Sequence, residues 1–223
     1  MAFRLYESEA SGKKKEEETG SSIVTGTVVN NCDLIAQGKV LVRIPSLDME
    51  VWARLTAIGG GSGAGFLYVP RPDDEVVVAM NKKDPDDAFV LGGLWSSSDS
   101  PPVDNPLEAP SKRVIKTGLK GGIGHEVLFD DAKQEITVTS STKQQITIDP
   151  KKIELTNTAG TLKITLDNTS QKVLIQGVNV EIAADAVLTL KGRKVDIQSE
   201  PGPMAIKAPA SDLTINGLMV RIN

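Results

Sequence analysis

The sequence predicts an all-β protein in which a small barrel precedes a long, thin β-prism that several identical chains build together. Three observations support this fold class. Residues 112–223 form a succession of short segments in which apolar and polar side chains alternate, as in half-buried strands. No segment of residues 23–95 has a helical period. No aromatic residue follows Phe129, which indicates a core too narrow for rings.

The first half of the chain supplies the barrel. Strands are expected at residues 23–29, 38–45, 50–58, 66–70, 75–80 and 88–95, because these runs are rich in β-branched and aromatic residues and turn residues separate them. About five or six strands in roughly 75 residues predict a small barrel such as an OB-fold. We expect Cys32 to be buried, and we expect the barrel core to contain Trp52, Phe66, Tyr68, Phe89 and Trp95.

Two polar segments divide the chain. Residues 1–21 are predicted to be a flexible N-terminal arm, because a block of lysines and glutamates lies there between small polar residues. Residues 98–111 read as a Ser/Pro linker, which the prolines keep extended. The predicted sections are therefore the arm at 1–21, the OB-fold domain at 22–97, the linker at 98–111 and the β-prism at 112–223.

The prism is expected to consist of short strands at residues 135–139, 145–149, 152–156, 162–166, 172–176, 179–183, 187–191, 194–198, 205–208, 213–216 and 218–222. Their apolar residues recur about every seven to eleven residues, as in a quasi-linear repeat. A single chain of this kind would leave its edges and apolar stripe open, and closure with copies of itself removes both. The predicted core positions, one for each strand, are Val138, Ile148, Leu155, Ile164, Ile175, Ile182, Leu190, Ile197, Ile206 and Ile215.

Charge and motif content argue against a nucleic-acid surface and against catalysis. Residues 1–110 carry 10 basic and 17 acidic side chains, whereas phosphate binding depends on Lys and Arg. The single histidine, His125, has no nucleophilic partner that the sequence can place, and alone it cannot form a metal site. The glycines of residues 59–65 lack the Gly-Lys-Ser/Thr ending of a phosphate-binding loop. We therefore expect no catalytic residue, metal or cofactor, and no enzymatic activity.

The N-terminus has no apolar core of a signal peptide, and no apolar run approaches the length of a membrane helix. The protein is therefore expected to be made in a cytoplasm and to leave it only by lysis or through a dedicated machine.

Five spaced runs of the barrel carry a family resemblance. Residues 38–45, 52–54, 63–70, 72–78 and 90–95, in this order, are similar to the OB-fold of the contractile-tail baseplate spike family. That family includes spikes of contractile phages, R-type bacteriocins and extracellular injection systems, and the C-terminal half of the type VI secretion spike. The trailing repeat of short strands is similar to the triple-stranded β-helix of the same family.

The resemblance implies a homotrimer, with the barrels docked under the hub and baseplate and with an intertwined triple-stranded β-helix directed at the target outer membrane. Assembled into a phage tail or injection particle, such a spike pierces the envelope mechanically when the sheath contracts. No lysozyme domain separates barrel from prism. The resemblance also implies a PAAR-like tip protein that covers the last strand, formed by Leu218, Met219, Val220, Arg221, Ile222 and Asn223.

Two alternatives from other classes remain open at this point. An OB-fold that binds nucleic acid or glycan on a fibrous stalk would need stacking aromatics, and for nucleic acid a basic groove. A single-chain β-solenoid enzyme would need a cluster of carboxylates on one face and would be monomeric.

Overall fold

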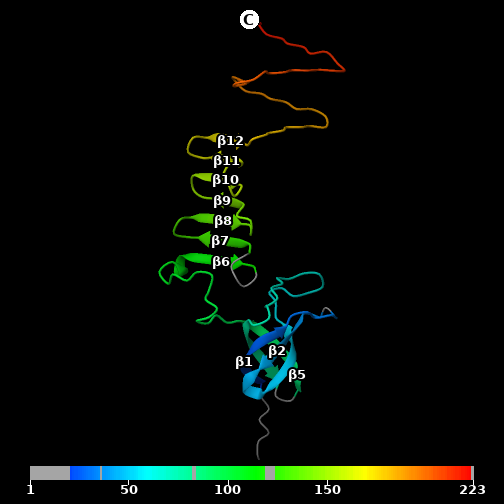
Figure 1. Ribbon diagram of the computed structural model, residues 1–223, viewed down its shortest axis with the longest axis vertical. Coiled ribbons are helices and arrows are strands. Elements are labelled where there is room, and N and C mark those ends of the chain that lie inside the picture. Colours follow the sequence, from blue (N-terminus) through cyan, green and yellow to red (C-terminus); the bar gives the residue numbers. More distant parts are fainter. Residues whose placement is uncertain (1–20, 36, 82–83, 119–123, 222–223) are drawn as a thin grey trace, which may run out of the picture.

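The computed structural model describes residues 21–35, 37–81, 84–118 and 124–221. Within them the chain is all-β, as predicted: a closed five-stranded barrel, a separate seven-stranded sheet, and only two short 3-10 turns, η1 (Pro45–Leu47) and η2 (Ala109–Ser111). Barrel and sheet follow one another along the long axis of the molecule, and residues 177–221 extend beyond the sheet (Figure 1). The predicted arm lies outside the described residues, apart from Ser21.

The barrel has the strand order β1-β2-β3-β5-β4, and β4 pairs with β1 to close it. All neighbouring strands are antiparallel except β3 and β5, which are parallel. This topology is that of a small Greek-key barrel of the OB type, as predicted. The strands are β1 (Ser21–Asn30), β2 (Lys39–Ile44), β3 (Met49–Leu55), β4 (Glu75–Asn81) and β5 (Asp84–Gly93).

Aliphatic side chains fill the barrel, and the expectation of an aromatic core is wrong. The buried core consists of Val28, Val40, Val42, Ile44, Val51, Ala53, Val76, Val78, Met80, Ala88 and Val90. These residues occupy alternate positions of their strands, and such a small barrel has room inside only for side chains of this size. By contrast Trp52 is 38% exposed and Trp95 70% exposed.

Two further expectations for the barrel are corrected. Residues 66–70 form no strand; they belong to a long connection between β3 and β4, in which one isolated bridge joins Gly61 to Ala64. Cys32 is exposed, because β1 ends at Asn30 and the chain leaves the barrel in a turn. In that turn the Asp33 carboxylate accepts hydrogen bonds from the backbone amides of Gln37 and Lys39.

The second sheet is an antiparallel meander in which each strand pairs with the next. All five strands expected between residues 135 and 176 are found within one residue of their predicted bounds. The strands are β6 (Lys112–Lys116), β7 (Glu126–Asp130), β8 (Glu135–Thr139), β9 (Gln145–Ile148), β10 (Lys152–Thr156), β11 (Lys163–Asp167) and β12 (Lys172–Gln176).

Side-chain acceptors cap five successive turns of this meander. At the end of the strand or just after it, one oxygen accepts a hydrogen bond from a backbone amide two to five residues later. The acceptors are Asp130, Ser140, Asp149, Asn157 and Asp167. Such local bonds satisfy turn amides and favour a tight reversal over continued extension. They explain why the strands are short and closely stacked.

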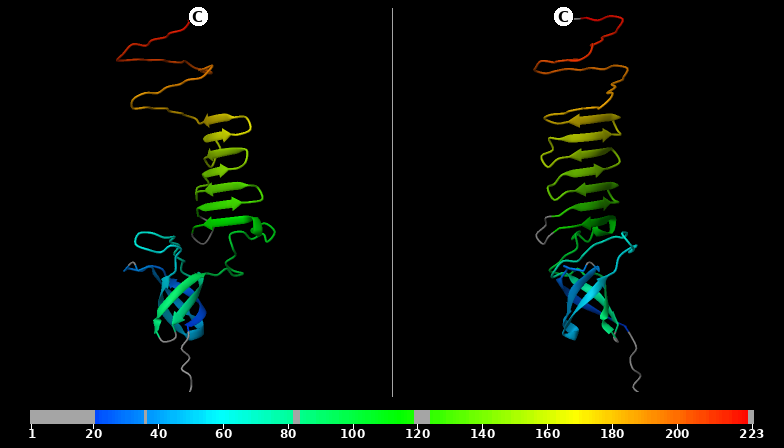
Figure 2. Two further views of the ribbon diagram at one scale, coloured as in Figure 1. Left: turned by 180° about the vertical axis from the view of Figure 1, so that it is seen from behind. Right: turned by 90° about the vertical axis from the view of Figure 1, so that its right-hand side faces the viewer.

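Residues 177–221 contain no hydrogen-bonded strand, although six were expected there. The segment winds upward beyond β12 in wide, extended turns (Figure 2). The physical reason is that a strand exists only against a hydrogen-bonding neighbour, and the isolated chain passes each level of this segment once. The alternation of apolar and polar residues is nonetheless the same as in the sheet below.

Among the described residues, no helix has the length and apolar character needed to cross a membrane.

Candidate functional site

The apolar face of the second sheet is the most extensive feature that the single chain leaves uncovered. Because the strands pair in register, alternate residues line up in two columns that run across all seven strands. The first column is Ile115, Val127, Val138, Ile146, Leu155, Ile164 and Ile175. The second is Arg113, Phe129, Ile136, Ile148, Ile153, Leu166 and Val173. Thirteen of these fourteen side chains are hydrophobic.

The structure places the predicted core positions of the sheet on this one face. Val138, Leu155, Ile164 and Ile175 belong to the first column, and Ile148 belongs to the second. The exposed fraction of Leu155 and of Ile164 is 42% in the single chain, a high value for aliphatic side chains in the middle of a sheet. The predicted core includes one position for each strand, and the second follows from the same alternation at i±2, which places two or three apolar side chains of a strand on one face.

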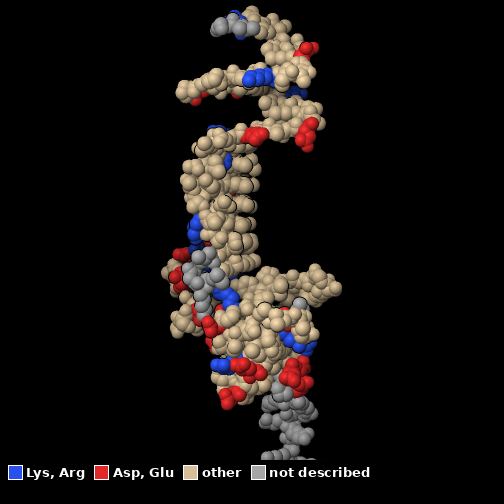
Figure 3. Space-filling model, turned by 45° about the vertical axis from the view of Figure 1, so that its right-hand side comes forward, with Lys and Arg blue, Asp and Glu red and all other residues tan. Residues whose placement is uncertain are grey.

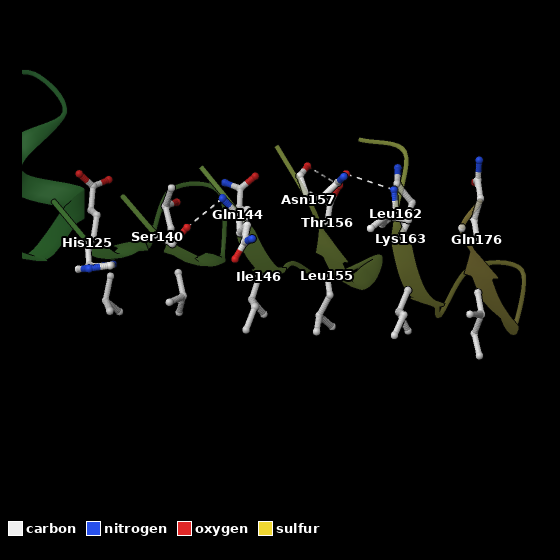
Figure 4. Close-up of a pocket in the computed structure, with 18 of the residues that line it drawn as sticks. His125, Ser140, Gln144, Ile146, Leu155, Thr156, Asn157, Leu162, Lys163 and Gln176 are labelled. Carbon is white, nitrogen blue, oxygen red and sulfur yellow. Dashed lines mark hydrogen bonds between the residues drawn. The ribbon is translucent and has the colours of Figure 1, made fainter. Parts of the chain in front are cut away.

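The first column lies along a groove that follows the sheet from β6 to β12, with a volume of about 770 Å³. Ile146 and Leu155 point into it from neighbouring strands (Figure 4). The turns form its other wall: the Gln144 amide donates to the Ser140 hydroxyl at 3.0 Å, and the Leu162 amide donates to the Asn157 side-chain oxygen at 3.1 Å (Figure 4). The groove is thus apolar along its floor and polar at its rim.

His125 lies at the β7 end of this groove. Its Nδ1 accepts a hydrogen bond from the backbone amide of Ser141 at 3.3 Å, and its own backbone is bonded to Thr117. The side chain is exposed, as the sequence predicted for a residue without a catalytic partner. Within the described residues, no three His, Cys, Asp or Glu side chains converge as metal ligands.

On the opposite face of the sheet, the central strands β8 to β11 present polar side chains, several of which bind one another. Thr137 and Thr165 are buried there, and the Thr165 hydroxyl bonds the Glu154 carboxylate at 3.2 Å. Lys152 and Lys163 place their ammonium groups 3.1 and 3.4 Å from the same carboxylate. Partial burial raises the pKa of Glu154, but the two lysines outweigh it and hold the pKa below its ordinary value. This face therefore needs no partner, whereas the apolar face does.

Charged side chains gather on the barrel, and much of the surface above it is free of them (Figure 3). The apolar pattern continues in residues 177–221, where Ile182, Leu190, Ile197, Ile206 and Ile215 are all more than 60% exposed. These side chains are removed from water only when another apolar surface covers them.

At the end of the described chain, Leu218, Met219, Val220 and Arg221 are also exposed. The other two residues of the predicted tip, Ile222 and Asn223, lie outside the described residues. The four described tip residues are adjacent in the sequence, and one side-chain contact joins two of them, between Arg221 Nε and Met219 Sδ at 3.1 Å.

The barrel is similar to a known domain. The family model for the type VI secretion system/phage-baseplate injector OB domain matches residues 24–95, which run from β1 to just beyond β5. The match therefore covers the closed barrel and the long connection between β3 and β4.

Three relatives extend the match beyond the barrel. The actin cross-linking toxin VgrG1 of Vibrio cholerae is 30% identical over 108 residues, which are 45% of this chain and 10% of the toxin. The type VI secretion system spike protein VgrG5 of Pseudomonas aeruginosa is 30% identical over 122 residues, 51% of this chain and 15% of that protein.

Spike protein VgrG1b of the same organism is 23% identical over 103 residues, 44% of this chain and 14% of that protein. The chain thus matches only a small part, 10% to 15%, of the length of each of these relatives. Over residues 24–95 the chain is similar to the type VI secretion and phage-baseplate injector OB domain, and this match and the VgrG relatives support its assignment to the baseplate spike family.

Proposed function

We propose that the chain is the structural spike of a contractile injection machine and that it works as a homotrimer. The observation that carries this proposal is the pair of apolar columns on the second sheet, which a single chain leaves open next to a baseplate OB domain. Three copies that face these columns toward one axis would bury them together in a core of aliphatic side chains.

In this proposal the chain divides into an OB-fold domain at 22–97, a linker at 98–111 and a trimeric spike at 112–223. The spike itself has two sections. Along β6 to β12 each chain contributes a complete sheet, so copies meet only through side chains. Along residues 177–221 the strands would form by pairing between chains, because the single chain supplies no partner for them. The core there would include Ile182, Leu190, Ile197, Ile206 and Ile215.

The role of such a trimer is mechanical. The barrels would dock under the hub of a baseplate, and the spike would transmit the force of sheath contraction to the target envelope. A PAAR-like protein would cover the exposed tip at residues 218–223. Transmission of force depends on a shaft whose backbone hydrogen bonds and apolar core open only together. The proposal assigns no enzymatic activity to the chain and places it in an assembled injection particle.

Sedimentation equilibrium of the purified chain tests the proposal. The expected mass is three times the chain mass of 23.7 kDa, at all concentrations that can be measured. A folded monomer would contradict it, because the apolar columns would then be stable in water. Negative-stain images of the same sample should show a thin rod with a wider base.

A binding module remains a second candidate because of one observation. Trp52 points outward from β3, 38% exposed, on the strand pair that many OB-folds use for ligands. The neighbouring cation is already engaged: Arg54 pairs with Asp87 at 2.8 Å and lies over the Phe89 ring. The hollow beside it is lined by Lys39 and Arg54 but also by Asp84, Asp86 and Asp87, so acidic side chains outnumber basic ones and disfavour phosphate. A salt-dependent gel shift with single-stranded oligonucleotides would support this candidate, and unshifted oligonucleotide at low salt would remove nucleic acid from it.

A further inference from the structure

The last part of the long β3–β4 connection carries side chains that reach across to the second sheet. We call residues 66–74 the bracket. Its aromatic residues were expected in the barrel core, but Phe66 and Tyr68 are each 51% exposed and stack on one another with ring centroids 6.4 Å apart. Their position therefore needs a different explanation from barrel packing.

The lower end of the bracket is fixed to β1 of the barrel. The Asp73 amide donates to the Val28 carbonyl at 2.8 Å, and the Val28 amide donates to the Asp74 carbonyl at 3.0 Å. The Asn31 side chain donates to the Pro70 carbonyl at 3.1 Å. These three bonds hold the bracket to the barrel along its length.

The bracket also holds the first strand of the sheet. The Tyr68 hydroxyl donates to the Lys116 carbonyl at 2.9 Å, and the Arg71 guanidinium donates to the Gly118 carbonyl. Asp74 keeps Arg71 in place, because its carboxylate lies 3.7 Å from Arg71 Nε and accepts the Arg71 amide at 2.7 Å. The phenol and the guanidinium therefore reach the sheet from a preset position.

The two accepting carbonyls are those that the sheet leaves free. The Thr117 amide donates to the His125 carbonyl, so Thr117 faces β7. In an antiparallel pair alternate residues face opposite sides, and Lys116 and Gly118 must therefore direct their carbonyls to the open edge of β6. That edge is one of the two ends of the seven-stranded sheet. The bracket thus satisfies edge groups that would otherwise be open to another strand.

We infer that the bracket couples the barrel rigidly to the shaft, with Tyr68 and Arg71 as positioning residues. The other connection, residues 94–111, contains no strand and one short 3-10 turn, and prolines and serines dominate its first part. A chain of that composition holds two bodies together without fixing their angle. The bracket fixes it, so that axial force applied to the barrel reaches the sheet without bending the joint. This inference rests on the proposed spike function.

The test uses the full-length chain labelled with a fluorescent maleimide at Cys32, its single cysteine, which is exposed on the barrel. Time-resolved anisotropy compares wild type with the double variant Tyr68→Phe/Arg71→Gln. The matched control is Arg43→Gln, which loses an ion pair of 2.7 Å with Glu50 on the barrel surface and no contact to the sheet. Circular dichroism and sedimentation of each variant establish that it is folded and report its oligomeric state.

Wild type and Arg43→Gln are expected to tumble as one long particle. The double variant should gain a faster component from independent motion of the barrel, because each lost hydrogen bond raises the uncoupled population by roughly fivefold to tenfold. Identical decays in the double variant and wild type, or free barrel motion already in wild type, would overturn the inference. Either result can occur in an intact trimer, so it leaves the proposed function standing; a monomeric wild type would remove that function instead.

Discussion

The sharpest consequence of the proposed assembly concerns Ile164, in the middle of the first apolar column. Its column neighbours are Leu155 on β10 and Ile175 on β12. Replacement of Ile164 by Asp puts a carboxylate at a position that is 42% exposed in the single chain and buried in a trimer. Ile164→Asp should therefore cost little stability in a single chain and much more in a trimer whose three chains share a core.

The magnitude follows from this difference. Full burial of an isoleucine side chain is worth about 1.5–3 kcal/mol, so the 42% that remains exposed accounts for about 1 kcal/mol per chain, or about 3 kcal/mol per trimer. Burial of a carboxylate without a partner costs several kcal/mol more for each chain. The sum exceeds about 10 kcal/mol, which is comparable to the whole stability of a typical domain. Trimers should therefore not form.

Sedimentation equilibrium measures the outcome directly. Ile164→Asp should sediment as a monomer or aggregate, with the far-ultraviolet spectrum of the barrel retained. Ile35→Asp is the matched control, because it makes the same chemical change on a barrel loop where the side chain is 70% exposed, and it should remain trimeric. A soluble Ile164→Asp trimer of normal stability would refute the assignment of the apolar columns to the core.

Three further predictions concern other parts of the chain. The trimer is expected to resist SDS at room temperature, because its chains are intertwined. Ile197→Asp should abolish this resistance, and an unchanged trimer band would exclude Ile197 from the core. Gly26→Ala should lower the stability of the barrel by about 1–3 kcal/mol in urea unfolding, because a Cβ there would lie 2.5 Å from Val42 Cγ1; Gly61→Ala, with open space around it, is the control. Backbone hydrogen bonds hold the pKa of Asp149 and of Asp167 below the ordinary 3.8. The two ionised carboxylates therefore contribute fully to stability well above pH 3.8, and this contribution is lost as the pH falls through their lower pKa values in the folded state. The urea concentration at the unfolding midpoint should accordingly fall below about pH 4. The fall should be smaller in the double variant Asp149→Asn/Asp167→Asn.

The sheet was predictable because its signal is local. Strict alternation and the turn residues between strands determine both the faces and the register, as the pairing of Ile153 with Leu166 and of Leu155 with Ile164 illustrates. The capping acceptors, such as Asp149 and Asn157, sit where a sequence reading expects turns. The face of the sheet that carries the two apolar columns can therefore be predicted from the sequence pattern alone.

The barrel core was not predictable in detail, for a reason of size. Composition suggested that aromatics would supply the buried area, but a closed five-stranded barrel has room inside for residues such as Val40, Val42 and Val76. The aromatics go outside, where Tyr68 and Phe66 serve the joint with the sheet and Phe89 lies under Arg54. No periodicity in the sequence distinguishes an outward tyrosine in a connection from a strand residue.

The absence of strands in residues 177–221 distinguishes the sheet, which one chain folds alone, from a segment that needs other chains to form strands. The segment has the same alternation as β8 to β12, yet it forms no strands and lacks the capped turns of the meander. The meander reverses direction at each turn and so brings its own partner strand alongside. A segment that advances along the axis with each turn does not pass an earlier part of itself at the spacing of paired strands, about 4.8 Å. Its backbone groups must then be satisfied by water or by sister chains. Hydrogen exchange decides between them: protected amides at 179–198 in the trimer would establish pairing between chains, and unprotected amides would limit the shared core to the sheet below.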